Sequence, residues 1–309
     1  MTLLHLLFID LPVRMQQTQG PLRTAILTLF TLVAFAANSV LCRLALGGGT
    51  IDAASFTTVR LLSGAVTLWL IVVLLRKTSI RVRRGSWISA AMLFLYAVTF
   101  SFAYISLSTG TGALILFGAV QGTMLLAGLL SGERPHLLQW GGLALALGGL
   151  VYLVFPGLTA PSPLGSFLMV ASGIAWGIYS IRGRRGADPI AVTGENFIGA
   201  VPLAILVSAF AFSSMELSTE GIVLALLSGS VTSGIGYVIW YAALRGLTAT
   251  RAAIVQLAVP VVAAAGGVAF LSEEISVRLI IATVAILGGI GLTVLRRERI
   301  VQAREPRAE

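Results

Sequence analysis

The sequence has little charge and almost no cysteine or histidine. Only 11% of its 309 residues are charged, whereas a typical soluble domain has about 25% charged residues. A soluble protein with so few charges would not stay dispersed in water. The single cysteine, Cys42, excludes an internal disulfide and a cysteine-based metal cluster. With only His5 and His136, a histidine-rich metal site is not expected either.

Hydrophobic residues make up 57% of the chain, and its mean hydropathy is +0.96. A helix that spans a bilayer needs about 20 mainly apolar residues. The sequence therefore predicts an all-α integral membrane protein with ten transmembrane helices and short connections. The ten predicted spans are 24–43, 54–75, 87–107, 112–131, 138–155, 165–182, 190–212, 220–242, 249–271 and 277–295.

Basic residues are concentrated in alternate connections. If the N-terminus is inside, the inner connections and tails hold 18 of the 21 basic residues, all except Arg43, Arg60 and Arg278. Because Lys and Arg accumulate on the cytoplasmic side, both termini are predicted to be cytoplasmic, in a bacterial inner membrane. The net charge of +9 is assigned to this orientation, and no nucleic-acid partner is expected.

The two halves of the chain repeat each other. Leu147-Gly148-Gly149 recurs as Leu287-Gly288-Gly289, and Ser131-Gly132-Glu133 corresponds to Leu271-Ser272-Glu273. Five helices per half is an odd number, so the halves must insert with opposite topology, as in many alternating-access carriers. The predicted parts are a cytoplasmic tail (1–23), a first five-helix repeat (24–155), a periplasmic linker (156–164), a second repeat (165–297) and a cytoplasmic tail (298–309).

Several helix ends carry recognisable residues. Asp52 and Asp188 are expected to be N-caps, with Pro189 at the first helical position. Glu133 and Glu273 are interpreted as a repeated corner that binds backbone amides of the following helix. Pro260 is a candidate for a bend in the span 249–271, although a packing role is favoured for it.

This 5+5 arrangement resembles the EamA-type members of the drug/metabolite transporter superfamily over residues 24–297. The Gly-Glu and Ser-Glu ends of the fourth and ninth spans and the Gly-Gly pairs of the fifth and tenth carry the resemblance. Within the superfamily, which also contains drug, sugar-phosphate and nucleotide-sugar carriers, the chain looks most like the YddG-type exporters of aromatic and other amino acids. The resemblance implies a central cavity lined by helices one, three, four, six, eight and nine. It does not imply a universal catalytic residue or a fixed coupling ion, and no cofactor is expected.

Aromatic side chains are candidates for the walls of that cavity. Side chains four residues apart share a helix face, and such faces are well suited to flat or apolar cargo and to an ammonium group. The alternative is that these rings mark the lipid–water interfaces or fill the bundle. The aromatic candidates are Tyr96, Phe100 and Tyr104; Trp176 and Tyr179; and Tyr237, Trp240 and Tyr241.

Polar residues within the spans are a second group of candidates. Asn38, Gln121 and Gln256 either bind the cargo or hydrogen-bond between helices. Two ionisable residues, Arg60 and Glu195, lie inside spans. Glu195 is a candidate for proton coupling, but the resemblance places both helices away from the cavity and favours pairing or snorkelling at the interface.

The sequence favours a carrier that exports amino acids, aromatic and other neutral ones first, by alternating access. Drugs, sugar phosphates and nucleotide sugars are alternative cargoes, and a channel is a less favoured class because no filter sequence or charged ring is present. An enzyme is not expected, because the spans contain no catalytic constellation. The partners expected are a small-molecule substrate and the lipid bilayer, and the chain is compatible with a monomer.

Overall fold

A computed structural model of the chain describes residues 21–76, 87–130, 137–155, 160–183, 189–244, 246–247 and 255–304. Within these ranges the regular structure is helical, and an isolated antiparallel bridge joins Ile51 to Leu217. The all-α prediction is confirmed for them. The helices are α2 (Pro21–Gly47), α3 (Ala53–Arg76), α4 (Trp87–Tyr104), α5 (Thr109–Leu130), α6 (Leu137–Val154), α7 (Pro163–Gly183), α8 (Pro189–Phe210), the short 3₁₀ turn η3 (Phe212–Ser214), α9 (Thr219–Leu227), the π-helical η4 (Ser228–Ile235), α10 (Gly236–Leu244), α12 (Val259–Leu271) and α13 (Val277–Arg304).

Six helices are long and apolar enough to cross a membrane: α2, α3, α4, α7, α8 and the continuous helix formed by α9, η4 and α10. Shorter apolar stretches lie in α6, α12 and α13. Length and composition of this kind are typical of membrane-spanning helices. The chain is thus a multi-pass helical membrane protein, while the number of ten transmembrane helices stays a prediction.

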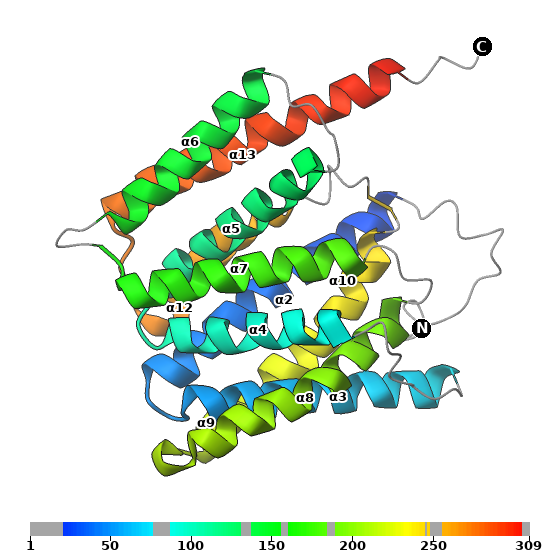
Figure 1. Ribbon diagram of the computed structural model, residues 1–309, viewed down its shortest axis with the longest axis vertical. Helices are drawn as coiled ribbons and strands as arrows, with labels where there is room; N and C mark the ends of the chain where they lie inside the picture. Colours follow the sequence, from blue (N-terminus) through cyan, green and yellow to red (C-terminus); the bar gives the residue numbers. More distant parts are fainter. Residues whose placement is uncertain are drawn as a thin grey trace.

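The helices stack along the long axis of the molecule (Figure 1). α6 and α13 pack side by side at one edge, and α3, α8 and α9 form the opposite edge (Figure 1). Between these edges, α5 packs against α12 and α7, α2 against α12 and α10, and α4 against α7 and α8. The helices α2, α4, α5, α7 and α10 therefore lie between the two edges, in the central part of the bundle.

Helix ends follow the local chemistry. Asp52 caps α3, because its Oδ1 accepts hydrogen bonds from the backbone N–H groups of Ala54 (3.0 Å) and Ser55 (2.9 Å). Pro189 begins α8 as predicted, whereas Asp188 and Glu133 lie outside the described residues. Pro260 lies in the first turn of α12, where a missing N–H leaves no hydrogen bond unmade. A turn at residues 257–258 interrupts the predicted span 249–271 directly before it, and the bend at Pro260 stays a prediction.

Two glycines let α6 and α13 approach closely. A Cβ at Gly149 would lie 2.8 Å from Ala285 Cβ, and one at Gly289 would lie 2.7 Å from the backbone nitrogen of Ala146. Gly288, in contrast, has open space at its Cβ position. Of these neighbouring glycines, only those that face the other helix are required for packing.

We predict that Gly289→Ala destabilises the protein and that Gly288→Ala does not. The Gly289 variant must overpack the α6–α13 interface, which costs about 1–3 kcal/mol. The Gly288 variant gains the better helix propensity of alanine, about 1 kcal/mol. Thermal unfolding of the two purified variants in detergent is the measurement, and equal melting temperatures would contradict the packing assignment.

Candidate functional site: a central aromatic cavity

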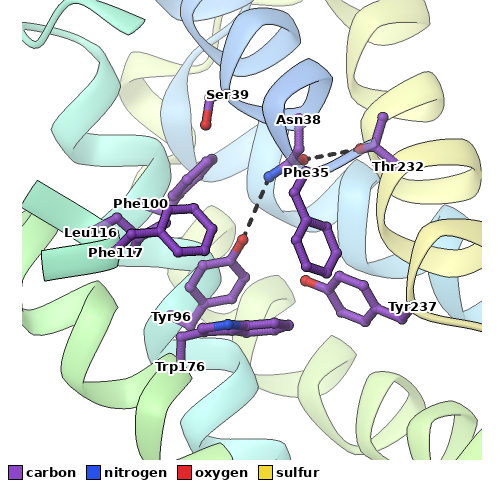
Figure 2. Close-up of a pocket in the computed structure, with 10 residues that line it drawn as sticks. All are labelled: Phe35, Asn38, Ser39, Tyr96, Phe100, Leu116, Phe117, Trp176, Thr232 and Tyr237. Atoms are coloured by element: carbon purple, nitrogen blue, oxygen red, sulfur yellow. Dashed lines mark hydrogen bonds between the residues drawn. The ribbon is translucent and has the colours of Figure 1, made fainter. Parts of the chain in front are cut away.

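A small cavity of about 20 Å³ lies among the central helices, with room for about one water molecule. Its lining comes from α2, α4, α5, α7, η4 and α10 (Figure 2). The lining residues are Phe35, Asn38, Ser39, Tyr96, Phe100, Leu116, Phe117, Trp176, Thr232 and Tyr237.

Aromatic rings from four helices form one side of the cavity (Figure 2). The Trp176 ring centroid lies 4.8 Å from that of Tyr96 and 5.0 Å from that of Tyr237. Phe35 packs edge-on against Tyr237 at 5.9 Å, and Phe100 lies 5.4 Å from Tyr96. These separations are those of favourable aromatic pairs. The rings therefore form a connected wall whose faces and edges are available to an apolar or flat ligand.

Asn38 joins three helices at the polar end of the cavity. Its Oδ1 accepts hydrogen bonds from the hydroxyls of Ser228 (2.7 Å) and Thr232 (3.1 Å), both on η4. Its Nδ2 donates to the Tyr96 hydroxyl on α4 at 3.5 Å (Figure 2). An amide buried in an apolar bundle needs such partners, so Asn38 serves as interhelical contact and as part of the lining at once.

The π-helical turn η4 brings its hydroxyls to the site. π-Bulges are rare and are frequent at functional sites. Gly229, in this turn, packs directly on α3: a Cβ there would collide with the Ser63 hydroxyl and the Arg60 carbonyl. The close approach of η4 to α3 places Ser233 against the side chain of Arg60.

Arg60 on α3 points into the protein, with 1% of its surface exposed. Its Nε donates to Ser233 Oγ (3.2 Å) and its Nη2 to the Tyr96 hydroxyl (3.0 Å). The guanidinium carbon lies 5.2 Å and 5.1 Å from the ring centroids of Tyr96 and Phe100, within cation–π range. The interpretation that Arg60 snorkels or pairs at the membrane interface is therefore wrong.

The structure places five of the predicted site residues on the cavity: Asn38, Tyr96, Phe100, Trp176 and Tyr237. Three others surround it. Tyr104 packs on Phe100, Tyr179 on Trp176, and Trp240 on Phe35.

The remaining candidates do not line this cavity. Gln121, Gln256 and Glu195 are buried and each has an interaction partner. Tyr241 lies one turn beyond Tyr237, and its hydroxyl is 2.7 Å from the Cβ position of Gly183. In the described part of the chain, His, Cys, Asp and Glu side chains form no group of three or more that could hold a metal ion.

Sequence reasoning missed five lining residues: Phe35, Ser39, Leu116, Phe117 and Thr232. Helical spacing was a usable signal for two of them. Phe35 is three residues before Asn38, and Phe117 is four residues before Gln121, so each shares a face with a predicted candidate. Thr232 gave no such signal, because the π-helical turn changes the register of its helix.

A network of charged and backbone groups closes the end of the bundle where α5 begins. Glu273, just after α12, accepts hydrogen bonds from the backbone N–H (2.8 Å) and hydroxyl (3.1 Å) of Thr109. It also forms an ion pair with Arg43 (3.5 Å), which itself donates to the carbonyls of Tyr104 and Ile105. Glu273 does bind a helix N-terminus, but that of α5 and not that of the following helix α13.

Comparison with known proteins gives a consistent result. The sequence profile of the EamA-like transporter family matches residues 163–295. An uncharacterized protein of Pseudomonas aeruginosa is 50% identical over 275 residues, which cover 89% of this chain and 96% of the relative. An uncharacterized transporter of Bacillus subtilis is 23% identical over 249 residues, 76% of this chain and 85% of the relative.

The fold is also similar to a solved protein. A crystal structure matches with a TM-score of 0.61 and 21% identity, and the match covers 88% of this chain and 97% of the solved chain. At this level of identity the likeness concerns the fold.

We predict that Glu273→Ala destabilises the protein by about 1–2 kcal/mol, as expected for the loss of a helix cap. Removing the carboxylate leaves the first N–H groups of α5 and the guanidinium of Arg43 without their acceptor. The adjacent Glu274→Ala removes an exposed carboxylate and should change stability little. Thermal unfolding in detergent is the measurement, and a loss of similar size in both variants would contradict the capping role.

Proposed function

Because the chain belongs to the EamA-like transporter family, we propose that this membrane transporter exports amino acids by alternating access through the central cavity. Aromatic and other neutral amino acids are the proposed cargo. The bacterial inner membrane, with both termini in the cytoplasm, is the proposed location, since the distribution of basic residues favours it.

The observation that carries this proposal is the lining of the cavity. Apolar walls with a few polar groups are typical of small-molecule sites. Here the rings of Phe35, Phe100 and Trp176 offer packing surface to a side chain. Asn38 and Tyr96 offer hydrogen-bonding groups at the other end of the same space (Figure 2). An amino acid has the same two parts, an apolar side chain and a polar backbone.

Packing between the helices supports two inverted halves. If α2 to α6 correspond to α7 to α13, the contact of α4 with α7 has its counterpart in the contact of α10 with α2. The contact of α5 with α7 likewise corresponds to that of α12 with α2. The pairs α3–α8, α5–α12 and α6–α13 each bring a helix against its own counterpart. Such a pattern is what a two-fold relation between halves produces.

We further propose that the Arg43–Glu273 network is the outer gate. It joins α2, the end of α4, the start of α5 and the end of α12 on the side predicted to be periplasmic. Alternating access needs one end of the cavity to close while the other opens. An ion pair with a few hydrogen bonds is suited to this task, because it is specific yet can exchange its partners for water.

Glu195 on α8 remains the candidate for proton coupling. It is buried, with 8% of its surface exposed, and lies one position before Asn196, whose Nδ2 donates to Tyr179 at 3.5 Å. Tyr179 in turn packs on Trp176 at the cavity. Glu195 is thus a buried carboxylate on the helix that also contacts the aromatic cluster, and we propose that its protonation is coupled to transport.

We predict that the purified protein in liposomes catalyses saturable counterflow of labelled phenylalanine and that Trp176→Ala lowers its rate at least about tenfold. Trp176 contacts Tyr96, Tyr237 and Phe35, so its loss opens the wall against which cargo packs. Trp140→Ala is the matched control, because Trp140 is 48% exposed on α6, and it should transport like the wild type.

Each outcome has a distinct meaning. Truncating a buried tryptophan to alanine costs about 3–5 kcal/mol of stability, so a lower transport rate in Trp176→Ala could come from unfolding. Trp176→Phe keeps an aromatic ring and tests this. Wild-type rates in folded Trp176→Ala would remove this residue from the site. If drugs or phosphorylated metabolites show counterflow and amino acids do not, the proposed cargo is wrong and one of these classes takes its place. Flux without counterflow would indicate a channel.

A further inference from the structure

Arg60 is a buried cation without a carboxylate partner among the described residues. The ion pair found there joins Arg43 to Glu273, at another place in the fold. Arg60 instead contacts hydroxyl groups and the rings of Tyr96 and Phe100. A buried charge is costly unless it is paired, and in transporters such residues mark substrate pathways. The protein therefore carries a positive charge beside the cavity that its own groups neutralise only in part.

Hydrogen-bond donors around this charge are not all used. Nη1 of Arg60 and the hydroxyl of Tyr237 are buried and have no hydrogen-bond partner among the described residues. The Tyr96 hydroxyl accepts from both Arg60 Nη2 and Asn38 Nδ2, so its own proton points elsewhere. Figure 2 shows the hydroxyls of Tyr96 and Tyr237 on facing sides of the cavity, with that of Tyr237 directed toward Tyr96.

Two acceptors in the same region already have donors. Asn38 Oδ1 accepts from Ser228 and Thr232, and Ser233 Oγ accepts from Arg60 Nε. The polar end of the cavity thus presents spare donors and a positive charge. Such surroundings are complementary to a group that only accepts hydrogen bonds and carries a negative charge.

We propose that Tyr96 and Tyr237 bind the carboxylate of the cargo and that Arg60 supplies the opposite charge from behind Tyr96. This proposal rests on the proposed function, because it names the part of an amino acid that the transport cavity recognises. Arg60 does not line the cavity in this structure, so it acts through Tyr96 and is a positioning residue. The aromatic wall then receives the side chain and, by cation–π contact, an ammonium group.

Four probes that share a phenyl group separate the possible recognition elements. Phenylalanine has a carboxylate and an ammonium group, 3-phenylpropionate only the carboxylate, phenethylamine only the ammonium group, and phenyl phosphate a different oxyanion. Each is tested in two ways: as a competitor of labelled phenylalanine counterflow, and by the rise in melting temperature that it gives the purified protein. A ligand that binds only the folded state raises that temperature.

The test variants are Arg60→Gln, which removes the charge, and Tyr237→Phe, which removes one hydroxyl. Matched controls are Arg182→Gln and Tyr152→Phe, since both of these residues are exposed. In the wild type, the two carboxylate probes should bind at least about tenfold more tightly than phenethylamine, as expected for a hydrogen bond to a charged group. Arg60→Gln and Tyr237→Phe should each reduce this ratio at least about fivefold, with little change in phenethylamine binding, and the controls should not.

Arg60→Lys distinguishes charge from shape. It should keep most of the preference for carboxylate probes, because lysine retains the charge, and a folded Arg60→Lys protein with no preference would overturn the proposal. If Arg60→Gln does not fold, Tyr237→Phe decides, since it removes one atom and leaves the charge in place.

The two proposals can fail separately. If amino acids are transported but Arg60→Gln and Tyr237→Phe leave the carboxylate preference unchanged, the carboxylate site is wrong and the transport function stands. If no amino acid is transported but 3-phenylpropionate stabilises the wild type and not Arg60→Gln, the site stands and the cargo is another carboxylate. Stabilisation by phenyl phosphate alone would overturn the carboxylate assignment in favour of a phosphorylated cargo.

Discussion

Lipid offers no hydrogen bonds, so every polar group within the bundle must find its partner inside the protein. The centre of this structure depends on how two such groups, Asn38 and Arg60, meet that requirement. Both donate to the hydroxyl of Tyr96, and both reach hydroxyls of the π-helical turn. These bonds fix α2, α3, α4 and η4 relative to one another. They also leave a polar end on a cavity whose other walls are aromatic, so the contacts that hold the helices together also give the site its chemistry.

The backbone of η4 makes this arrangement possible. Gly229 permits contact with the carbonyl of Arg60 and the hydroxyl of Ser63 that any larger residue would prevent. Because the π-helical turn inserts extra residues into its helix, Ser228, Thr232 and Ser233 all face inward. A regular α-helix would turn part of this set away from Asn38 and Arg60. The turn is thus a local irregularity that places hydroxyl groups beside Asn38 and Arg60.

The membrane helices, one helix cap and part of the candidate site could be predicted from the sequence. The features that could not be predicted depend on contacts between residues far apart along the chain. Apolar length predicted the membrane helices, the N-cap at Asp52 follows from local chemistry, and the spacing of Tyr96 and Phe100 placed both on one face. The π-helical turn was not predicted, and Gly229 within it packs on residues of α3 that lie far away in the sequence. Glu273 was expected to bind the next helix and binds α5 instead, a choice that only the tertiary arrangement decides. Arg60 was assigned to the interface because the resemblance placed its helix away from the cavity, yet its long side chain reaches Tyr96, which lines the cavity.

The comparison of the two halves gives the charge of Arg60 a further meaning. In the proposed repeat, Arg60 corresponds to Asn196, which is also buried and also contacts a tyrosine beside the cavity, Tyr179. Among the described residues, Nη1 of Arg60 is a donor without a partner, and Oδ1 of Asn196 is an acceptor without one. An inverted repeat would by itself give a site that is the same at both ends. A guanidinium in one proposed half, where the other has an amide, breaks this equivalence. Because an amino acid has different groups at its two ends, such a polar asymmetry would allow the proposed carrier to bind this cargo in one orientation.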